Sequence, residues 1–246
     1  MFGFFKKKEY KKEITFDYSS IMVDMHSHVL PGIDDGAKDP QESIVLIKKM
    51  MALGIKKIIA TPHIMADYYR NTPETINESL VILKEELHKQ KIDIAIEAAA
   101  EHYFDETFEE RIDRRELMTM GDNYVLFEFS FISQPPNTIS VVQKLKDLGY
   151  KPILAHPERY PYMDIDQFKA LHDWGVSLQI NTISLTGYYG KESKKMAEDL
   201  IDAQLVDFIS SDMHHLRHAD AFKHALKMPY LEKVLFDYPL KNIMLK

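Results

Sequence analysis

The sequence predicts an α/β fold in which a parallel sheet closes, or nearly closes, into a barrel. Strand-like apolar runs alternate with amphipathic helical segments, a pattern typical of parallel strands joined by right-handed crossovers. Seven such units follow one another without a linker, and six of the seven runs end on His, Asp or Glu. Functional residues of a (β/α) barrel collect at the carboxyl ends of its strands, so we expect these side chains to form one site. The alternative is an open doubly wound sheet.

The expected strands are short runs rich in β-branched and apolar residues. They lie near residues 21–25, 57–61, 93–100, 124–129, 151–155, 176–181 and 206–210. No Gly-x-Gly-x-x-Gly motif follows any of these runs, which weakens the doubly wound alternative as a dinucleotide-binding fold.

The segments between the strands carry apolar residues at helical spacing. Pro40 suits the first turn of a helix, and Gly54 marks its end. The apolar face of this helix would consist of Ile44, Ile47, Met51 and Ile55. Residues 73–90 would form a second helix. The remaining helical patterns cover residues 138–148, 164–174 and 191–204, with Gly149 and Gly175 as expected stops.

Composition limits the chemistry available to this chain. It has 246 residues, a net charge of −7 and no cysteine. Disulfides, thiolate zinc sites and a cysteine nucleophile are therefore excluded, and any metal would have imidazole and oxygen ligands. The acidic balance and the lack of a basic stripe argue against nucleic acid as a partner. The lack of cysteine fits a cytoplasmic location. Because there is no apolar run of about 18 residues, we expect no transmembrane helix.

Residues 1–19 differ from the rest and are predicted to be a basic, aromatic N-terminal tail. Phe2, Phe4 and Phe5 precede a group of lysines. Lysines that attract anionic headgroups and phenylalanines that insert would give weak contact with a membrane surface. A frayed, flexible terminus is the simpler interpretation and the one we favour. The single folded domain is then expected to span residues 20–246.

Two i, i+2 pairs are the most specific local signals. His26 and His28 follow the first strand-like run, and Asp212 and His214 follow the last. On an extended segment residues i and i+2 point the same way, so both members of a pair could reach one ion. Either pair alone would more often be a surface feature, but its place after a buried strand favours a metal site. The neighbouring His215 is expected near the site without binding a metal, or at the surface, as is His218.

Glutamate and histidine end four further runs. They are His63, Glu101, Glu128 and His156. A buried glutamate needs an ion, an arginine or a proton to offset the cost of burying its charge, and one carboxylate can bridge two metals. Glu97 is the alternative to Glu101 as the inward residue of its segment. A lone histidine at a strand end is more often structural, so it is the shared position of these residues that indicates a site.

Three further residues would serve catalysis. Asp34-Asp35-Gly36 is an ordinary turn sequence, but beside the first histidine pair it offers an oxygen ligand or a proton-transfer group. Arg159 follows His156 by three residues, and arginine binds phosphate oxygens through paired hydrogen bonds, which suggests a phosphorylated substrate. An ion pair of Arg159 with Glu158 or another acid is the alternative. Arg217 is a weaker second candidate.

These elements together resemble the PHP superfamily (polymerase and histidinol phosphatase). The matching blocks follow the family's order over nearly the whole domain, at residues 24–28, 63, 100–101, 128, 156 and 211–214. Within the superfamily, the sequence is most similar to the bacterial metal-dependent protein tyrosine phosphatases of the CpsB/YwqE type. That likeness rests on residues 26–36, 127–130, 155–160 and 211–214.

The resemblance implies a distorted (β/α)7 TIM-like barrel, the PHP fold, with three divalent ions, usually Mn²⁺, with Fe or Zn as alternatives. It assigns the first ion to His26, His28, Glu101 and Asp212. It assigns the second to Glu101, Glu128 and His156, with Glu101 as the bridge, and the third to Asp35, His63 and His214. Arg159 would bind the phosphate. Asp35 and Arg217 complete the implied catalytic set, although Arg217 does not align cleanly with the family's second arginine.

The function implied is that of a protein tyrosine phosphatase, a phosphoric monoester hydrolase. A metal-bound hydroxide would attack the phosphorus of phosphotyrosine in line. The partner would be a phosphotyrosine protein, with a bacterial tyrosine kinase of exopolysaccharide synthesis as the candidate, and the activity would regulate polysaccharide biosynthesis.

Three other functions are alternatives to this one. A small-molecule phosphomonoesterase, such as a histidinol phosphatase, would use the same metals on a different substrate. A nuclease or polymerase-associated module is disfavoured by the acidic balance of the chain. A binding protein without turnover is disfavoured because carboxylates clustered without a metal would repel one another.

Overall fold

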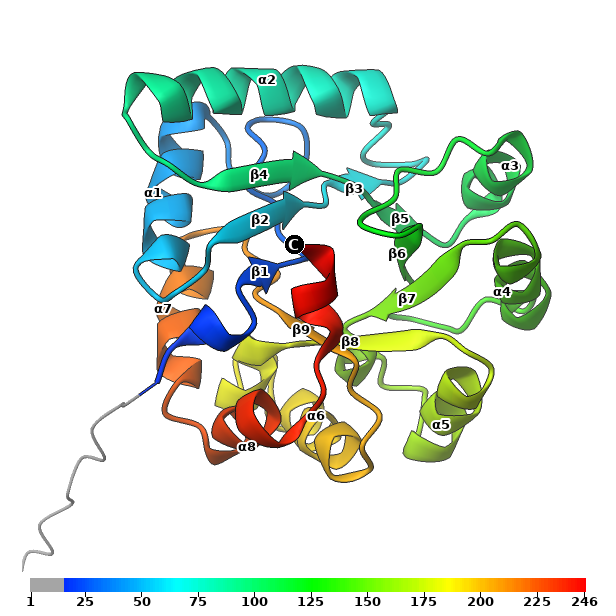
Figure 1. Cartoon of the computed structure of the whole chain (residues 1–246). Helices are drawn as coiled ribbons and strands as arrows, with labels where there is room; N and C mark the ends of the chain where they lie inside the picture. The colour runs from blue at the N-terminus through cyan, green and yellow to red at the C-terminus, as the bar shows by residue number, and fades with distance from the viewer. Residues whose placement is uncertain (1–15) are drawn as a thin grey trace, which may run out of the picture.

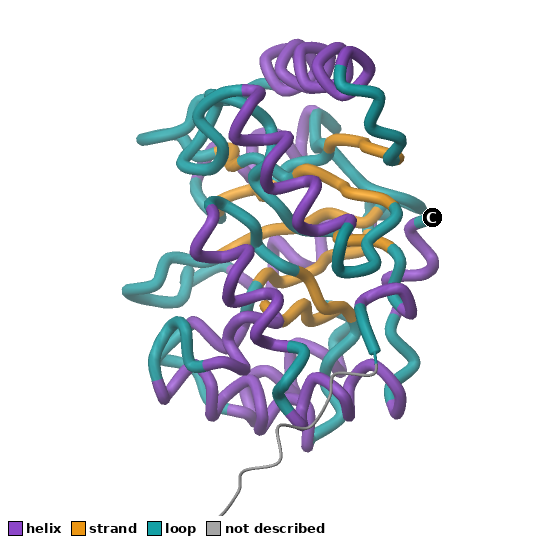
Figure 2. Tube along the Cα trace, turned by 90° about the vertical axis from the view of Figure 1, so that its left-hand side faces the viewer, coloured by secondary structure: helices purple, strands orange, loops and turns teal. Residues whose placement is uncertain are grey.

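Every pairing between the strands of this fold is parallel. The computed structural model describes residues 16–246, and within them the α-helices surround the strands (Figures 1 and 2). The parallel α/β architecture predicted from the alternation of the sequence is confirmed. The first 15 residues of the predicted tail, with their phenylalanines and lysines, lie outside the described residues.

The described strands form two hydrogen-bonded sheets rather than one continuous ladder. The smaller sheet has the order β1-β2-β4, from Val23–Asp24, Lys57–Ala60 and Ala95–Ala98. The larger sheet has the order β3-β5-β6-β7-β8-β9. Its strands are His63–Ile64, Glu101–Tyr103, Tyr124–Glu128, Lys151–Ala155, Ser177–Asn181 and Phe208–Ser210.

A short interruption of the ladder at Pro62 divides the two sheets, because residues 57–60 pair with 95–98 and residues 63–64 pair with 101–102 in the same register. The strand predicted near 57–61 is followed directly by a second one, β3, and the strand predicted at 93–100 ends before β5 begins. Pro62 has no N–H to donate to a ladder, and its carbonyl accepts from the Glu101 N–H at 3.1 Å. His63 and Glu101 are consequently paired in register at the start of the larger sheet.

Five predicted helices are confirmed with small shifts of their ends. They are α1 (Pro40–Met51), α2 (Pro73–Lys89), α4 (Thr138–Asp147), α5 (Ile165–Asp173) and α6 (Lys191–Asp202). The prediction missed α3 (Glu106–Arg114), α7 (Leu216–Ala225) and α8 (Pro229–Asp237). It also missed the 3-10 helices η1 (Tyr18–Ser20), η2 (Pro157–Arg159), η3 (Thr182–Thr186) and η4 (Lys241–Leu245). Helix α3 buries only Phe108 and Ile112, too few apolar positions for a periodic signal.

Side chains, rather than a strand ladder, join β1 to β9. The Asp24 carboxylate accepts hydrogen bonds from the Ser211 N–H at 2.8 Å and from the hydroxyl groups of Ser210 and Ser211. The C-terminal η4 lies across both strands (red in Figure 1) and contributes the buried Asn242. Its amide accepts from the Ile209 N–H and donates to the carbonyls of Val23 and Ile209. This seam brings the ends of the first and last strands together.

The connection continues beyond the strands into the segments that carry the predicted ligands. Ser27 and Met213 form an isolated parallel bridge. The Asp212 N–H donates to the His26 carbonyl at 2.9 Å, and the His28 N–H donates to the Met213 carbonyl, also at 2.9 Å. Residues 26–28 and 212–214, almost 190 positions apart in the sequence, therefore lie side by side.

Part of the predicted tail packs against the folded body. Tyr18 is fully buried, and its ring stacks on Phe222 with the ring centres 3.9 Å apart. The Tyr18 hydroxyl donates to the Phe222 carbonyl at 2.8 Å. Within residues 16–246, none of the helices combines the length and the apolar character needed to cross a bilayer.

Replacing Asn242 by Ala tests the seam between β1 and β9. The substitution leaves one buried N–H and two carbonyls without their partner, and we expect it to lower the free energy of unfolding by about 2–4 kcal/mol. Urea unfolding measures the loss. Asn77→Ala, at an exposed position of α2, is the control and should change stability by less than about 0.5 kcal/mol. Equal effects of the two substitutions would contradict this role for Asn242.

Candidate metal centre

The predicted ligands meet in an open pocket of about 510 Å³ at the carboxyl ends of the strands. Seven of the nine candidate ligands line it: Asp35, His63, Glu101, Glu128, His156, Asp212 and His214. The other two, His26 and His28, are fully buried and contact Glu101 and Asp212. One end of the site is thus shielded from solvent, and the other end is open to solvent through the pocket.

The buried end of the site consists of His26, His28, Glu101 and Asp212. The Nε2 atoms of His26 and His28 are 3.2 Å apart and lie 3.2 and 3.4 Å from Glu101 Oε2. Each also lies 3.5 Å from Asp212 Oδ1. Two donors bound to one ion at about 2.0–2.2 Å are separated by roughly 3.0–3.6 Å. The spacing of these four atoms therefore suits a single ion.

Glu101 faces a second group as well. Its Oε1 lies 3.0 Å from His156 Nε2, which is 3.7 Å from Glu128 Oε2. Its Oε2 lies 3.1 Å from His63 Nδ1, which is also 3.1 Å from Glu128 Oε1. The carboxylate of Glu101 is placed to reach both groups. His63, which the resemblance assigned to the third ion alone, faces this second group too.

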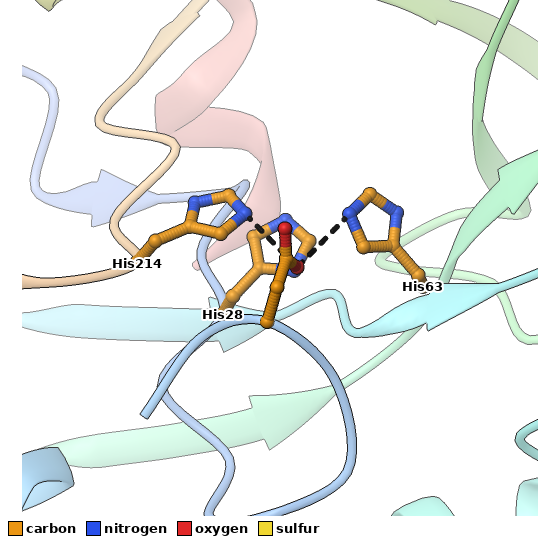
Figure 3. Close-up of side chains that lie close together, drawn as sticks. His28, His63 and His214 are labelled. Carbon is orange, nitrogen blue, oxygen red and sulfur yellow. Dashed lines mark ion pairs between the residues drawn. The ribbon is translucent and has the colours of Figure 1, made fainter. Parts of the chain in front are cut away.

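The third group lies nearest the pocket mouth. Asp35 Oδ1 is 3.4 Å from His63 Nε2 and 3.5 Å from His214 Nε2. Figure 3 shows His28, His63 and His214 gathered around this point, with dashed lines for the two ion pairs. The His28 ring stacks on that of His214, with their centres 3.9 Å apart. Asp35, His63 and His214 lie together as the resemblance implied, and His28 joins them.

The unpaired oxygen of Glu101 shows that this donor set suits a cation. Glu101 Oε2 is buried and lies within 3.4 Å of three ring nitrogens, yet it makes no hydrogen bond to any described residue. This oxygen and the ring nitrogens face common points that a cation could occupy, and the oxygen does not face an N–H group that would donate to it. Donors of this kind, imidazole and carboxylate without thiolate, suit divalent ions such as Mn²⁺, Fe²⁺ or Zn²⁺.

The charges of these groups shift one another's pKa values strongly. Burial alone would lower the pKa of His28, but the carboxylates of Asp34 and Glu101 together outweigh it and raise that pKa to about 10. Burial would raise the pKa of Glu101, yet His26 and His63 hold it well below its usual value. The carboxylate is therefore ionised, and the site requires positive charge, from protons or from the metal ions that compete with them.

Two candidate ligands have a backbone conformation that non-glycine residues rarely adopt. His156 has φ of +33° and Asp212 has φ of +50°. The Asp212 carbonyl lies 2.9 Å from His214 Nδ1 and 2.8 Å from His218 Nδ1, so both rings help to hold it. Strained residues of this kind cluster at functional sites.

Asp34 supports a candidate ligand and does not face the pocket itself. Its Oδ2 lies 2.8 Å from His28 Nδ1, and its Oδ1 accepts from the Gly36 N–H at 2.9 Å. The carboxylate therefore fixes the tautomer in which His28 turns Nε2 toward Glu101. Of the two adjacent aspartates, the structure turns Asp35 toward the site.

Arg159 is held between two aromatic rings at the pocket wall. Its guanidinium lies 4.4 Å from the centre of the Phe131 ring and 4.2 Å from that of Tyr189. Its Nη1 donates to Asp212 Oδ2 at 3.3 Å. The alternative, an ion pair, is observed with another acid, Asp212, and not with Glu158, whose Oε1 accepts from the Asn181 N–H and the Ser184 hydroxyl. Arg159 is thus oriented beside the candidate ligands.

The structure does not bring every candidate to the pocket. Arg217 is exposed on α7 and is not among the residues that line the pocket. Glu97 is exposed and pairs with Lys57, so Glu101 is the inward residue of its segment. His215 and His218 do line the pocket, next to the ligands as expected.

Sequence reasoning missed the two rings that hold Arg159. Phe131 continues the alternation of Phe127 and Phe129 past the end of β6, which is the one signal that could have identified it. Nothing in the local sequence distinguishes Tyr189 from its neighbour Tyr188.

A family model described as CpsB/CapC, capsular polysaccharide synthesis, matches residues 22–235. Tyrosine-protein phosphatase YwqE of Bacillus subtilis is 33% identical over 199 residues, which is 80% of this chain and 78% of that protein. Tyrosine-protein phosphatase CpsB of Streptococcus pneumoniae is 30% identical over 203 residues, 79% of this chain and 84% of that protein.

The fold is also similar to a solved structure from the same group. That structure belongs to work on YwqE from Bacillus subtilis and CpsB from Streptococcus pneumoniae, described as unique metal-dependent tyrosine phosphatases. The TM-score is 0.77 at 30% sequence identity, and the match covers 89% of this chain and 96% of the other.

Replacing Glu101 by Gln tests whether the pocket binds metal. The amide keeps the size of the side chain but cannot offer an oxygen to both groups, so we expect fewer divalent ions per chain. Metal analysis of the purified protein measures this. The control is Glu97→Gln, four residues away on the exposed side of the same segment, and its metal content should match the wild type. Unchanged metal in Glu101→Gln would contradict the assignment.

Proposed function

The chain belongs to the CpsB/CapC family, and from that membership we propose that it removes phosphate from phosphotyrosine in proteins. It is an enzyme of the tyrosine-protein phosphatase type, a phosphoric monoester hydrolase. The single observation that carries the proposal is the buried Glu101 carboxylate, which faces ring nitrogens of four histidines without a hydrogen bond from three of them. A metal-dependent phosphatase needs such a donor set.

We assign the metal sites as the three groups of donors suggest. One ion would be held by His26, His28, Glu101 and Asp212, a second by Glu101, Glu128 and His156, and a third by Asp35, His63 and His214. Three ions of Mn²⁺ are our proposal for the native complement. When bound, divalent ions neutralise charge on phosphate oxygens and lower the pKa of water so that it can attack at neutral pH.

The protein's own residues would bind and orient the phosphate. Arg159 already gives one N–H to Asp212, and its other donors are available to phosphate oxygens, where they would offset charge that grows in the transition state. Asp35 is half exposed at the mouth and can accept a proton from water. The attack forms a bond from the water oxygen to phosphorus and breaks the bond to the tyrosine oxygen. Tyrosine and inorganic phosphate are the products.

The pocket wall favours an aryl phosphate over a small polar one. Phe131, Ile132, Met65 and Tyr103 line the pocket beside the candidate metal ligands. Phe131 and Ile132 are both exposed, and Ile132 retains 88% of its accessible surface. An apolar rim of this kind would bury the phenyl ring of phosphotyrosine. The alternative, a histidinol phosphatase, has no comparable support from the relatives.

The type of barrel, the bounds of the domain and the partner protein are also proposals. The two sheets and the seam between β1 and β9 are consistent with the distorted (β/α)7 barrel of the PHP type. We place this domain at residues 20–246 together with the packed residues before them, which include Tyr18. A tyrosine kinase of exopolysaccharide synthesis in the cytoplasm is the partner we propose, in keeping with the capsular polysaccharide synthesis of the family. We assign no catalytic role to Arg217, because its exposed position is away from the pocket lining.

Substitution of Arg159 by Lys tests phosphate binding. Lysine keeps the charge but loses the planar stacking and the paired donors, so kcat/KM for a phosphotyrosine peptide should fall about 10²- to 10³-fold. Arg217→Lys is the matched control and should stay within about twofold of wild type. If the two variants lost activity equally, or if neither did, the assignment would be wrong.

A comparison of substrates tests the proposed specificity. Protein stripped by a chelator and restored with Mn²⁺ would be assayed side by side on a phosphotyrosine peptide and on histidinol phosphate. We expect activity to vanish on chelation, to return with the metal, and to be greater on the peptide because the apolar rim binds its ring. Faster turnover of histidinol phosphate would refute the substrate assignment, and activity that survives chelation would refute the metal.

A further inference from the structure

Strand β8 carries no candidate ligand, yet its end reaches the metal centre. Gln179 and Asn181 are fully buried, and as residues i and i+2 of one strand they point to the same face. A buried amide without a partner is costly, so each must satisfy both its oxygen and its nitrogen inside the protein. Their partners are the candidate metal ligands.

The two amides form an unbroken path of hydrogen bonds between two ligands. His26 Nδ1 lies 2.8 Å from Gln179 Oε1. Gln179 Nε2 donates to Asn181 Oδ1 at 2.9 Å, and Asn181 Nδ2 donates to Asp212 Oδ2 at 2.7 Å. The path therefore connects the end of the first strand with the end of the last through the strand that supplies no ligand.

The carboxylate at one end fixes the direction of every bond in the path. Ionised Asp212 can only accept, so Asn181 must turn its NH₂ group toward it and its oxygen toward Gln179. Gln179 then turns its own NH₂ group toward Asn181 and its oxygen toward His26. An oxygen at that place requires a hydrogen on His26 Nδ1, which leaves the lone pair of His26 on Nε2.

Both ligands thus present one defined atom to the site. His26 presents Nε2, which is 3.2 Å from Glu101 Oε2. Asp212 Oδ2 accepts from Asn181, Arg159 and Tyr189, and Asp212 Oδ1 faces His26 and His28 at 3.5 Å. His28 is oriented differently, by the charged Asp34. The neutral amides orient His26 without adding a further negative charge to the buried end.

We propose that Gln179 and Asn181 are positioning residues, which preset His26 and Asp212 to bind a divalent ion through Nε2 and Oδ1. The inference rests on the proposed metal-dependent function. It makes a separate claim, because it concerns how the protein binds the ion and not which substrate it hydrolyses. Hydrogen-bond partners of this kind typically contribute about 10- to 100-fold to metal affinity.

The test measures the affinity of the chelator-stripped full chain for Mn²⁺ alone, by titration with the electron paramagnetic resonance signal of free Mn²⁺ as readout. Gln179→Leu keeps the size of the side chain and removes the acceptor for His26, so we expect the dissociation constant of the tightest site to rise at least about 10-fold. The control is Gln143→Leu on the exposed face of α4, which should bind Mn²⁺ like the wild type.

A purely structural role is separated by the melting temperature of the metal-free protein. We expect the metal-free Gln179→Leu variant to melt at a lower temperature than wild type, because His26 Nδ1 and Asn181 Oδ1 lose their partner. Its Mn²⁺ affinity should also fall at temperatures well below that melting point, where the variant is folded. Unchanged affinity overturns the inference. If Gln179→Leu does not fold, Asn181→Ser decides, because it breaks the link to Asp212. A rise in the dissociation constant of about 10-fold supports the inference, and an unchanged constant overturns it.

Failure of the proposed function would give a different experimental result from failure of the positioning roles. A wild-type protein that binds Mn²⁺ but does not hydrolyse a phosphotyrosine peptide would refute the function, and the affinities of the variants would still decide the roles of Gln179 and Asn181. An active wild type whose Gln179→Leu variant binds Mn²⁺ normally would refute the positioning roles alone.

Discussion

The structure depends on one electrostatic constraint: several carboxylates and imidazoles share a buried volume in which their lone pairs face one another. Glu101 sits at the centre, with its two oxygens 3.0–3.4 Å from the ring nitrogens of His26, His28, His63 and His156. Ionised carboxylates that are this close to other buried polar groups and shielded from water are unstable without compensating positive charge. A cation between them turns the same arrangement into a set of ligands. The stability of this end of the domain and its chemistry are therefore linked through metal binding.

The fold meets this constraint by bringing the two ends of the chain together. β1 and β9 do not share a ladder in the described sheets, and the side chains of Asp24 and Asn242 bridge them instead. That seam sets His26 beside Asp212, and the amides of β8 fix which atom of each faces the site. Arg159 is held in turn by Asp212 and by two aromatic rings. One hydrogen-bonded network therefore joins the two strands, places the candidate ligands and orients the arginine that we propose to bind phosphate.

The sequence predicted the features that repeat along the chain and missed those that depend on distant contacts. Strands and five helices followed from periodicity, and the ligand-type residues followed from their common place at strand ends. Pro62 could be read in the sequence, but the bond of its carbonyl to the Glu101 N–H, which carries the pairing on into β3 and β5, could not, because Glu101 lies on another strand. Phe131 and Tyr189 acquire their importance from Arg159, which lies on a third segment. Of two adjacent acidic residues, only the three-dimensional contacts show that Asp34 supports His28 while Asp35 faces the pocket.

The most direct test of the central claim is a crystal structure of the Mn²⁺-loaded protein with anomalous diffraction measured at the manganese edge. The account predicts anomalous peaks in the pocket between the histidine nitrogens and the carboxylate oxygens, one of them shared by Glu101 with His26 and His28. A loaded crystal with no anomalous peak in contact with Glu101 would contradict it.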